Sequence, residues 1–450
     1  MTEAEESLGR LLEVRDAAEP AFLRALRAAG SDTFLRVKLP TTRHEDWRYT
    51  SLAGLAQRTL SRPLAGGVLS LPLAASPPRP PQAGEGRGEG GLPPAPRLVF
   101  LNGRLDPSLS DLSGLPAGLR AGSLAAALRE RPAAVEPHLG RIAPAQDHAF
   151  AALNAGLFQD GAFVEVGEGV RCEAPVHLVF LTSAAPGDGL AAVHPRTLVL
   201  AAPRSRATLV EHHLGGGSYL SSAVTELVLG DGAEVEHDRV QEEAPGAFHV
   251  GLLHVEQGVR SHFTGQSIAL GGALARVEAR VHLAGEDAFC DLHGLYVGAG
   301  KQVLDHFVHV DHASPRATSR QVFKGILDGA SKGVFAGRVL VREGAQKTDA
   351  GQVNSNLLLS EAATVDTKPQ LEILADDVKC SHGGTVGQIR EDQLFYLRSR
   401  GVPAALARAL LTWAFAAEMV ERVGPEEVRA QVRRAVTARL PAGELLREVA

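Results

Sequence analysis

Several residue types are scarce in this chain of 450 residues, and each scarcity excludes a class of protein. The three cysteines, Cys172, Cys290 and Cys380, lie far apart and form no C-x-x-C pair. This spacing argues against a disulfide framework and against a metal cage made of this chain's thiolates alone. No apolar run is long enough to cross a bilayer, and the acidic start lacks a signal-peptide pattern. We therefore expect a cytoplasmic protein without a membrane segment.

Nucleotide and nucleic-acid signatures are also missing. The net charge is −6, which argues against a general nucleic-acid binder. The segment GAGK at 298–301 lacks the rest of a phosphate-binding loop, so we expect no nucleotide site and assign any ATP chemistry to a partner. Only two tryptophans and four tyrosines are present, which argues against the sugar-stacking groove of a polysaccharide-active β-helix enzyme.

The chain divides by composition and periodicity into five segments. Helical spacing is typical of both ends, and short alternating strands closed by glycine or acidic turns fill the middle. The segments are an N-terminal helical region (1–73), a Pro/Gly-rich flexible insertion (74–97), a mixed segment (98–160), a β core (161–389) and a C-terminal helical domain (390–450).

Within these segments, the pattern predicts helices at about 4–29, ended by Gly30, and at 145–158. The repeated turns of the β core, such as LGDGAEVE and LDGASKGVF, favour a parallel β-helix over a sandwich or barrel. Trp413 and Phe415 in the C-terminal helices are interpreted either as core residues or as anchors for a partner.

Histidine is the most unevenly distributed residue. Thirteen of the 17 histidines lie between His177 and His312. Residues two apart share a strand face, so His309 and Asp311 are expected together while His306 points the other way. The sequence does not show that these imidazoles converge. Two interpretations therefore remain open: histidines that lie on solvent-exposed faces or stack along the coils, and histidines that bind a metal.

A second cluster of polar residues is DDVKCSHGGT, from Asp376 to Thr385. Cys380 and His382 are expected on one strand face, but two residues apart they do not form a nucleophile–base pair. Thiolate and imidazole both bind iron and iron–sulfur clusters, yet one of each cannot complete a cluster's coordination. The segment is compatible with half of a shared site and with no site.

The segment from Gln346 to Gly401 resembles the SufB/SufD family of the bacterial SUF iron–sulfur cluster assembly machinery, in the form typical of its SufD members. The similarity is carried by VDTKPQLEI (Val365 to Ile373), DDVKCSHG (Asp376 to Gly383) and FYLRSRG (Phe395 to Gly401), and upstream by HEDWRYTSL (His44 to Leu52). The paralogous SufB form looks different at 376–383, and it is the second alternative beside a polysaccharide-active enzyme.

The resemblance implies a mainly β protein: a right-handed parallel β-helix flanked by helical regions. It implies a heterodimer with SufB through the β-helices, or a homodimer in isolation. The C-terminal helices, with Trp413 and Phe415, would dock the SufC ATPase, and a SufE- or SufU-type protein would donate sulfur indirectly. The chain would then be a non-catalytic scaffold subunit. His382, and more weakly Cys380, would contact iron or a transient cluster at the SufB junction, and a reduced flavin is implied for the complex.

Overall fold

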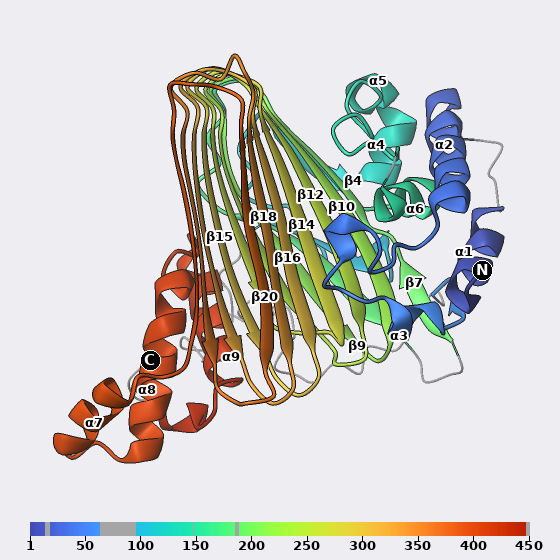
Figure 1. Cartoon of the computed structure of the whole chain (residues 1–450). Helices are drawn as coiled ribbons and strands as arrows, with labels where there is room; N and C mark the ends of the chain where they lie inside the picture. The colour runs from blue at the N-terminus through green and yellow to red at the C-terminus, as the bar shows by residue number, and fades with distance from the viewer. Residues whose placement is uncertain (14–18, 64–95, 147, 185–188, 447–450) are drawn as a thin grey trace, which may run out of the picture.

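The chain forms a long β-solenoid with helices attached at both ends (Figure 1). The computed structural model describes residues 1–13, 19–63, 96–146, 148–184 and 189–446. Two sheets face each other, and successive strands of the solenoid alternate between them, so that each coil contributes one strand to each sheet. The expected mainly β architecture with flanking helical regions is confirmed. Most of the predicted insertion at 74–97 lies outside the described residues.

The first sheet, sheet A, takes every second strand of the solenoid. Its order is β20 (Thr364–Ile373), β18 (Lys332–Val341), β16 (Val303–His312), β14 (Leu274–Leu283), β12 (Phe248–Gln257), β10 (Tyr219–Leu229), β8 (Arg196–Ala201), β5 (Ala162–Val166) and β4 (Leu119–Ser123). β7 (Leu190–Val193) also pairs with β10 and with β1 (Leu60–Ser61). All these pairs are parallel except β4 with β5.

The second sheet, sheet B, contains the intervening strands. Its order is β21 (Lys379–Gly387), β19 (Asp349–Leu358), β17 (Thr318–Leu327), β15 (Phe289–Gly298), β13 (His262–Ala269), β11 (Glu234–Glu243), β9 (Arg206–Gly216), β6 (Val176–Ser183), β2 (Arg97–Leu101) and β3 (Arg104–Leu105). Because β2 already pairs with β6, the solenoid sheets extend upstream of residue 161, where the sequence pattern placed the start of the core.

The turns between coils explain the repeated sequence pattern. Gly232 and Gly329 each follow an aspartate and have φ of 65° and 64°, a region that favours glycine. After each turn a strand begins in register with the strand two before it, as in Val235 beside Phe263 and Cys290. Each coil therefore contains two strands, one from each sheet, and the recurring turns in the sequence lie between these strands.

The solenoid interior is filled by alternate residues of both sheets. Phe180, Leu209, Phe263, Leu292 and Phe323 of sheet B belong to one buried cluster with their counterparts from sheet A. Those counterparts are Leu227, Val255, Val281, Val308 and Phe335. Each such side chain contributes roughly 1.5–3 kcal/mol when it leaves water, so the stacked coils stabilise one another.

The N-terminal helices cover the outer face of sheet A (Figure 1). They are α1 (Glu3–Leu12), α2 (Ala21–Val37), η1 (Glu45–Trp47), α3 (Ala53–Ala56), α4 (Leu124–Glu130), α5 (Pro132–Val135) and α6 (Ala149–Leu157). The predicted helix at 145–158 is confirmed as α6.

The predicted stop of the first helix at Gly30 is wrong, because α2 continues to Val37. Gly30 instead lies against α6, where an added Cβ would come within 2.7 Å of the Ala152 carbonyl oxygen. The glycine therefore permits close packing of two helices. Pro20 precedes the first residue of α2, where a proline is tolerated.

The HEDWRYTSL element fastens the N-terminal region to the solenoid. The Arg276 guanidinium lies 4.1 Å from the centroid of the Trp47 ring, which also stacks on Phe150. Thr50 donates a hydrogen bond of 2.5 Å to the buried carboxylate of Asp305. This element, a motif in the sequence, therefore has a structural role in the fold.

The C-terminal helices cover the outer face of sheet B. α8 (Ala404–Val420) and α9 (Glu426–Thr437), followed by η3 (Gly443–Leu446), bury Met419 and Val432 against outward-facing Val240 and Ile268. α7 (Glu391–Ser399) extends from this layer and lies apart from the sheets (Figure 1).

Candidate functional site

The last coil of the solenoid, β20 and β21, is uncapped. Each strand ends its sheet and pairs on one side only, β20 with β18 and β21 with β19. The burial of the preceding coils shows which residues face inward: Phe335 and Val339 in β18, and Gln352 and Asn354 in β19. Their register partners in the last coil also point inward, yet most of β21 is exposed. No described coil covers this end of the solenoid.

His382 lies in this open end. It is the register partner of the buried, inward-facing Gln352, and it is itself exposed. Its strand also carries Val386, an inward-facing apolar residue with half of its surface exposed. The imidazole therefore stands at the mouth of the solenoid, on the strand that ends sheet B.

Cys380 occupies a different environment, although it lies on the same strand face as expected. It is half-buried and packs with Leu371, Val339 and Ala350. Burial raises the pKa of the Cys380 thiol, which a hydrogen bond with the Ala350 backbone only partly offsets. A thiol held protonated is a poor nucleophile and a poor metal ligand, so its packing role dominates.

The aspartates of the DDVKCSHGGT segment belong to the turn before β21. Asp377 forms an ion pair with Lys347 of the preceding coil, and its backbone N–H donates to the Gln346 side chain. Asp376 and Asp377 are exposed. In the described part of the chain, no group of three or more His, Cys, Asp or Glu side chains is arranged to hold a metal ion.

A lane of polar side chains runs through the solenoid interior beneath His382. Gln352 donates to Gln321 at 2.8 Å, and Asn356 donates to Asn354 at 2.6 Å. Tyr296 donates to Asn356 at 2.5 Å. The sequence analysis did not single out this lane, although the alternation of polar residues in QVNSN was its signal.

The lane continues toward earlier coils as buried charged residues. Glu211 accepts hydrogen bonds from Arg239 at 3.1 Å and from Thr225 at 2.6 Å. Burial opposes ionisation of Glu211, but Arg239 and neighbouring histidines hold its pKa well below the usual range. Polar and charged side chains thus share the solenoid interior with the apolar cluster.

The histidine-rich region does not form one site. His306 faces inward and donates to or accepts from Ser267 at 3.0 Å, whereas His309 and Asp311 lie on the outer face, as the alternation predicts. Burial lowers the pKa of His306 and of His254 to about 3. These imidazoles are neutral at physiological pH and spread over several strands of both sheets.

Trp413 and Phe415 are both half-buried in α8. They pack against the C-terminal cluster, and the Lys324 ammonium lies 4.6 Å from the Phe415 ring centroid. Phe395 and Tyr396 of α7 are instead exposed, with 72% and 58% of their surfaces accessible to solvent. These two residues lie in the FYLRSRG motif, but the sequence analysis did not assign them a role.

The helices in the described ranges lack the combination of length and apolar character that a membrane span requires. The reduced flavin that the resemblance implies stays a prediction.

The fold is a parallel β-solenoid flanked by two helical layers, with no described coil over its last two strands. Two family models match the chain: the SUF system FeS cluster assembly SufBD core domain at residues 180–415, and the SufBD protein N-terminal region at 95–178. The chain belongs to the SufBD family of iron–sulfur cluster assembly proteins.

Individual relatives agree with this assignment. The chain is 32% identical to the iron–sulfur cluster assembly protein SufD of Escherichia coli K12, over 91% of each chain. It is also 32% identical to an iron–sulfur cluster assembly SufBD family protein of Synechocystis sp., over 97% of this chain and 96% of that one. The chloroplastic protein ABCI7 of Arabidopsis thaliana is 34% identical over 63% of this chain and 61% of its own. The expected similarity to SufD is confirmed.

Proposed function

We propose that this chain is a scaffold subunit for iron–sulfur cluster assembly, pairing with a SufB-type sister chain and docking a SufC-type ATPase. The observation that carries the proposal is the uncapped last coil, which leaves inward-facing residues and His382 exposed. The chain itself is not catalytic in this proposal, since ATP hydrolysis belongs to the docked partner. The cluster is the cargo of the complex, and it leaves for a client protein.

His382 is the proposed ligand on this side of the junction. Imidazole is a common ligand for iron, and the sister chain would supply the remaining ligands. Cys380 is the weaker candidate because its thiol packs into the last coil and has a raised pKa. The shared site would form only when two chains meet.

Cluster yield from the complex tests the role of His382. The chain is co-expressed with its sister chain and the ATPase, and the complex is purified anaerobically. We expect His382→Ala to leave the complex intact and to remove most of the visible absorbance of the cluster. His44→Ala, which changes another exposed histidine, is the matched control. Wild-type absorbance in the His382→Ala complex would contradict the assignment.

Pairing through the last coil is tested by two exposed valines on neighbouring strands. Val386 of β21 faces inward at the open end and is 50% exposed, whereas Val353 of β19 faces outward and is 45% exposed. We expect Val386→Glu to abolish co-purification of the sister chain, because pairing would bury a carboxylate that has no charged partner. Val353→Glu should pair normally. Equal behaviour of the two variants would argue against this junction.

Docking of the ATPase is assigned to α7. Exposed aromatic pairs are typical anchors of protein interfaces, and Phe395 and Tyr396 lie next to each other on a helix that contacts little of the solenoid. The double variant Phe395→Ala/Tyr396→Ala should lose the ATPase in pull-down assays while it keeps the sister chain. Leu35→Ala, at an exposed leucine of α2, serves as control. Retention of the ATPase by the double variant would contradict the assignment of the docking surface to α7.

A further inference from the structure

A groove lies at the start of the solenoid, at the end opposite β20 and β21. It has a volume of about 380 Å³ and runs between α2, α4 and the segment that follows α6. Its apolar wall includes Leu23, Leu128, Leu157 and Phe158. This volume is typical of a site for a small molecule, and it is too small for a folded partner.

The groove carries an excess of positive charge. Four arginines line it together with one acidic residue, Glu19. Arg27 is already paired: its Nε donates to Glu19 at 2.8 Å, and Nη1 donates to the Phe158 carbonyl at 2.8 Å. Within the described ranges, the side chains of Arg62, Arg104 and Arg129 form no ion pair or hydrogen bond, and all three residues are exposed.

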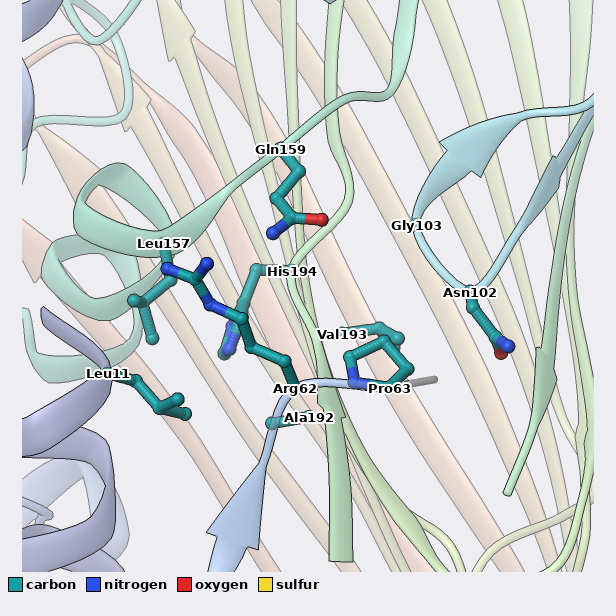
Figure 2. A pocket seen from close by; sticks show the side chains of 10 residues that line it. All are labelled: Leu11, Arg62, Pro63, Asn102, Gly103, Leu157, Gln159, Ala192, Val193 and His194. Atoms are coloured by element: carbon teal, nitrogen blue, oxygen red, sulfur yellow. The ribbon is translucent and has the colours of Figure 1, made fainter. Parts of the chain in front are cut away.

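A second cavity of about 20 Å³ adjoins this groove and shares Arg62, Leu157 and Gln159 with it. This volume holds about one water molecule. Its wall includes His194, which is only 8% exposed. Figure 2 shows the His194 side chain pointing into this space, with the Arg62 side chain extending past it toward Leu157.

His194 has no hydrogen-bond partner for either ring nitrogen among the described residues. Burial, together with the charge of Arg62, lowers the pKa of His194 to about 3, so the ring is neutral. A neutral imidazole presents one donor and one acceptor, and leaving both unpaired when buried is costly. The ring is therefore suited to a ligand or bound water that both donates and accepts.

We propose that this groove binds a phosphate-bearing small molecule. Arg62 and Arg104 would receive the phosphate, since guanidinium groups match phosphate oxygens in geometry and charge. A monohydrogen phosphate has both an O–H donor and free acceptor oxygens, which suits His194 directly or through one water. The apolar wall would receive the body of the molecule. The site is independent of the last coil and of the proposed cluster chemistry.

Calorimetric titration of the full chain with inorganic phosphate, pyrophosphate, AMP and citrate tests the proposal, with ionic strength held constant by chloride. We expect the phosphate compounds to bind, with AMP at least about tenfold tighter than inorganic phosphate because it also covers the apolar wall. Citrate distinguishes a general carboxylate site from a phosphate site. Tighter binding of citrate than of pyrophosphate would overturn the phosphate assignment.

Arginine variants place the binding in the groove. Arg62→Gln and Arg104→Gln should each weaken AMP binding at least about tenfold, because each removes a charged hydrogen bond. Arg171→Gln, at an exposed arginine outside the groove, should bind like the wild type. In NMR spectra, the pKa of His194 should rise when AMP binds, since an anion stabilises the imidazolium. No binding up to about 10 mM, or binding that neither groove variant weakens, would overturn the proposal.

Discussion

Single residues in the last coil have unusual surroundings for their position in the pattern. Leu371, Val386 and His382 all face inward, yet each is more exposed than its register partner in the preceding coil. The same alternation therefore produces a core residue in one coil and a surface residue in the last. The face shared by Cys380 and His382 could be predicted from their spacing alone, whereas their different burial could not.

The stability cost of truncating an inward-facing leucine should depend on its coil. Leu304→Ala, which truncates a fully buried side chain of β16, should lower the free energy of unfolding by about 3 kcal/mol. Leu371→Ala should cost about 1 kcal/mol in the isolated chain, because part of that side chain is already in water. Urea unfolding monitored by circular dichroism measures both values. Equal costs would indicate that the last coil is covered in the free chain.

At the scale of single strands and helices, the sequence pattern predicts which face a residue lies on but not which element covers that face. Histidines spaced along strands signal alternation, but the sheets decide that His306 enters the polar lane and His254 lies beneath the N-terminal region. Gly30 is a similar case. A glycine after a helical pattern predicts a helix end, but α2 continues through Gly30 and packs closely against α6 there. In both cases the neighbouring element, which is distant in sequence, sets the outcome.

Buried histidines should make the solenoid acid-sensitive. Burial lowers the pKa of His254, His306 and His212 to about 3, below the unfolded value near 6.5. The unfolded chain then binds more protons, so stability is present above pH 6.5 and falls as the pH drops toward 3. Between pH 7.5 and 5.5 we expect a loss of about 1 kcal/mol per such histidine in urea unfolding.

A single substitution checks the origin of this pH dependence. His254→Gln should reduce the loss of stability between pH 7.5 and 5.5, because glutamine does not titrate. His44→Gln, at an exposed histidine, should leave it unchanged. A stability that stays flat over this range in the wild type would mean that the buried imidazoles do not resist protonation.

The strap formed by HEDWRYTSL should hold the N-terminal region on sheet A. Trp47→Ala removes a buried ring that contacts Arg276 and Phe150, and we expect a loss of about 3–5 kcal/mol. Limited proteolysis should then release the N-terminal region before the solenoid is cleaved. The stability of Trp47→Phe should lie between that of the wild type and that of Trp47→Ala. Simultaneous cleavage of both parts would indicate that the strap does not act separately.

The whole molecule is asymmetric along its solenoid. The N-terminal helices and the arginine-lined groove lie near the start of the solenoid, on the side of sheet A, while no described coil covers the strands at the other end (Figure 1). Open strand edges with exposed apolar residues favour pairing with another chain. The proposed junction at the last coil and the proposed small-molecule groove thus lie at opposite ends of the solenoid, and the C-terminal helices lie along its side.

Without a sister chain, the open end should pair with itself. We expect the isolated protein to form a homodimer in sedimentation experiments at micromolar concentration, because the same inward-facing residues are exposed in both copies. Val386→Glu should shift it to a monomer, and Val353→Glu should not. A wild-type monomer over the whole accessible concentration range would show that the exposed coil is not sufficient for pairing.

The sequence by itself determined the alternation of strands, the helical ends, the missing nucleotide loop and the motifs that indicate the SufBD family, since these depend on local spacing and composition. Only the tertiary structure decided which coil is last, which polar residues line the interior and which aromatics are exposed. The physical reason is that burial in a solenoid depends on the coil stacked above. The strand that carries His382 follows the same inward–outward alternation as the strand that carries Gln352, but no coil among the described residues stacks on it.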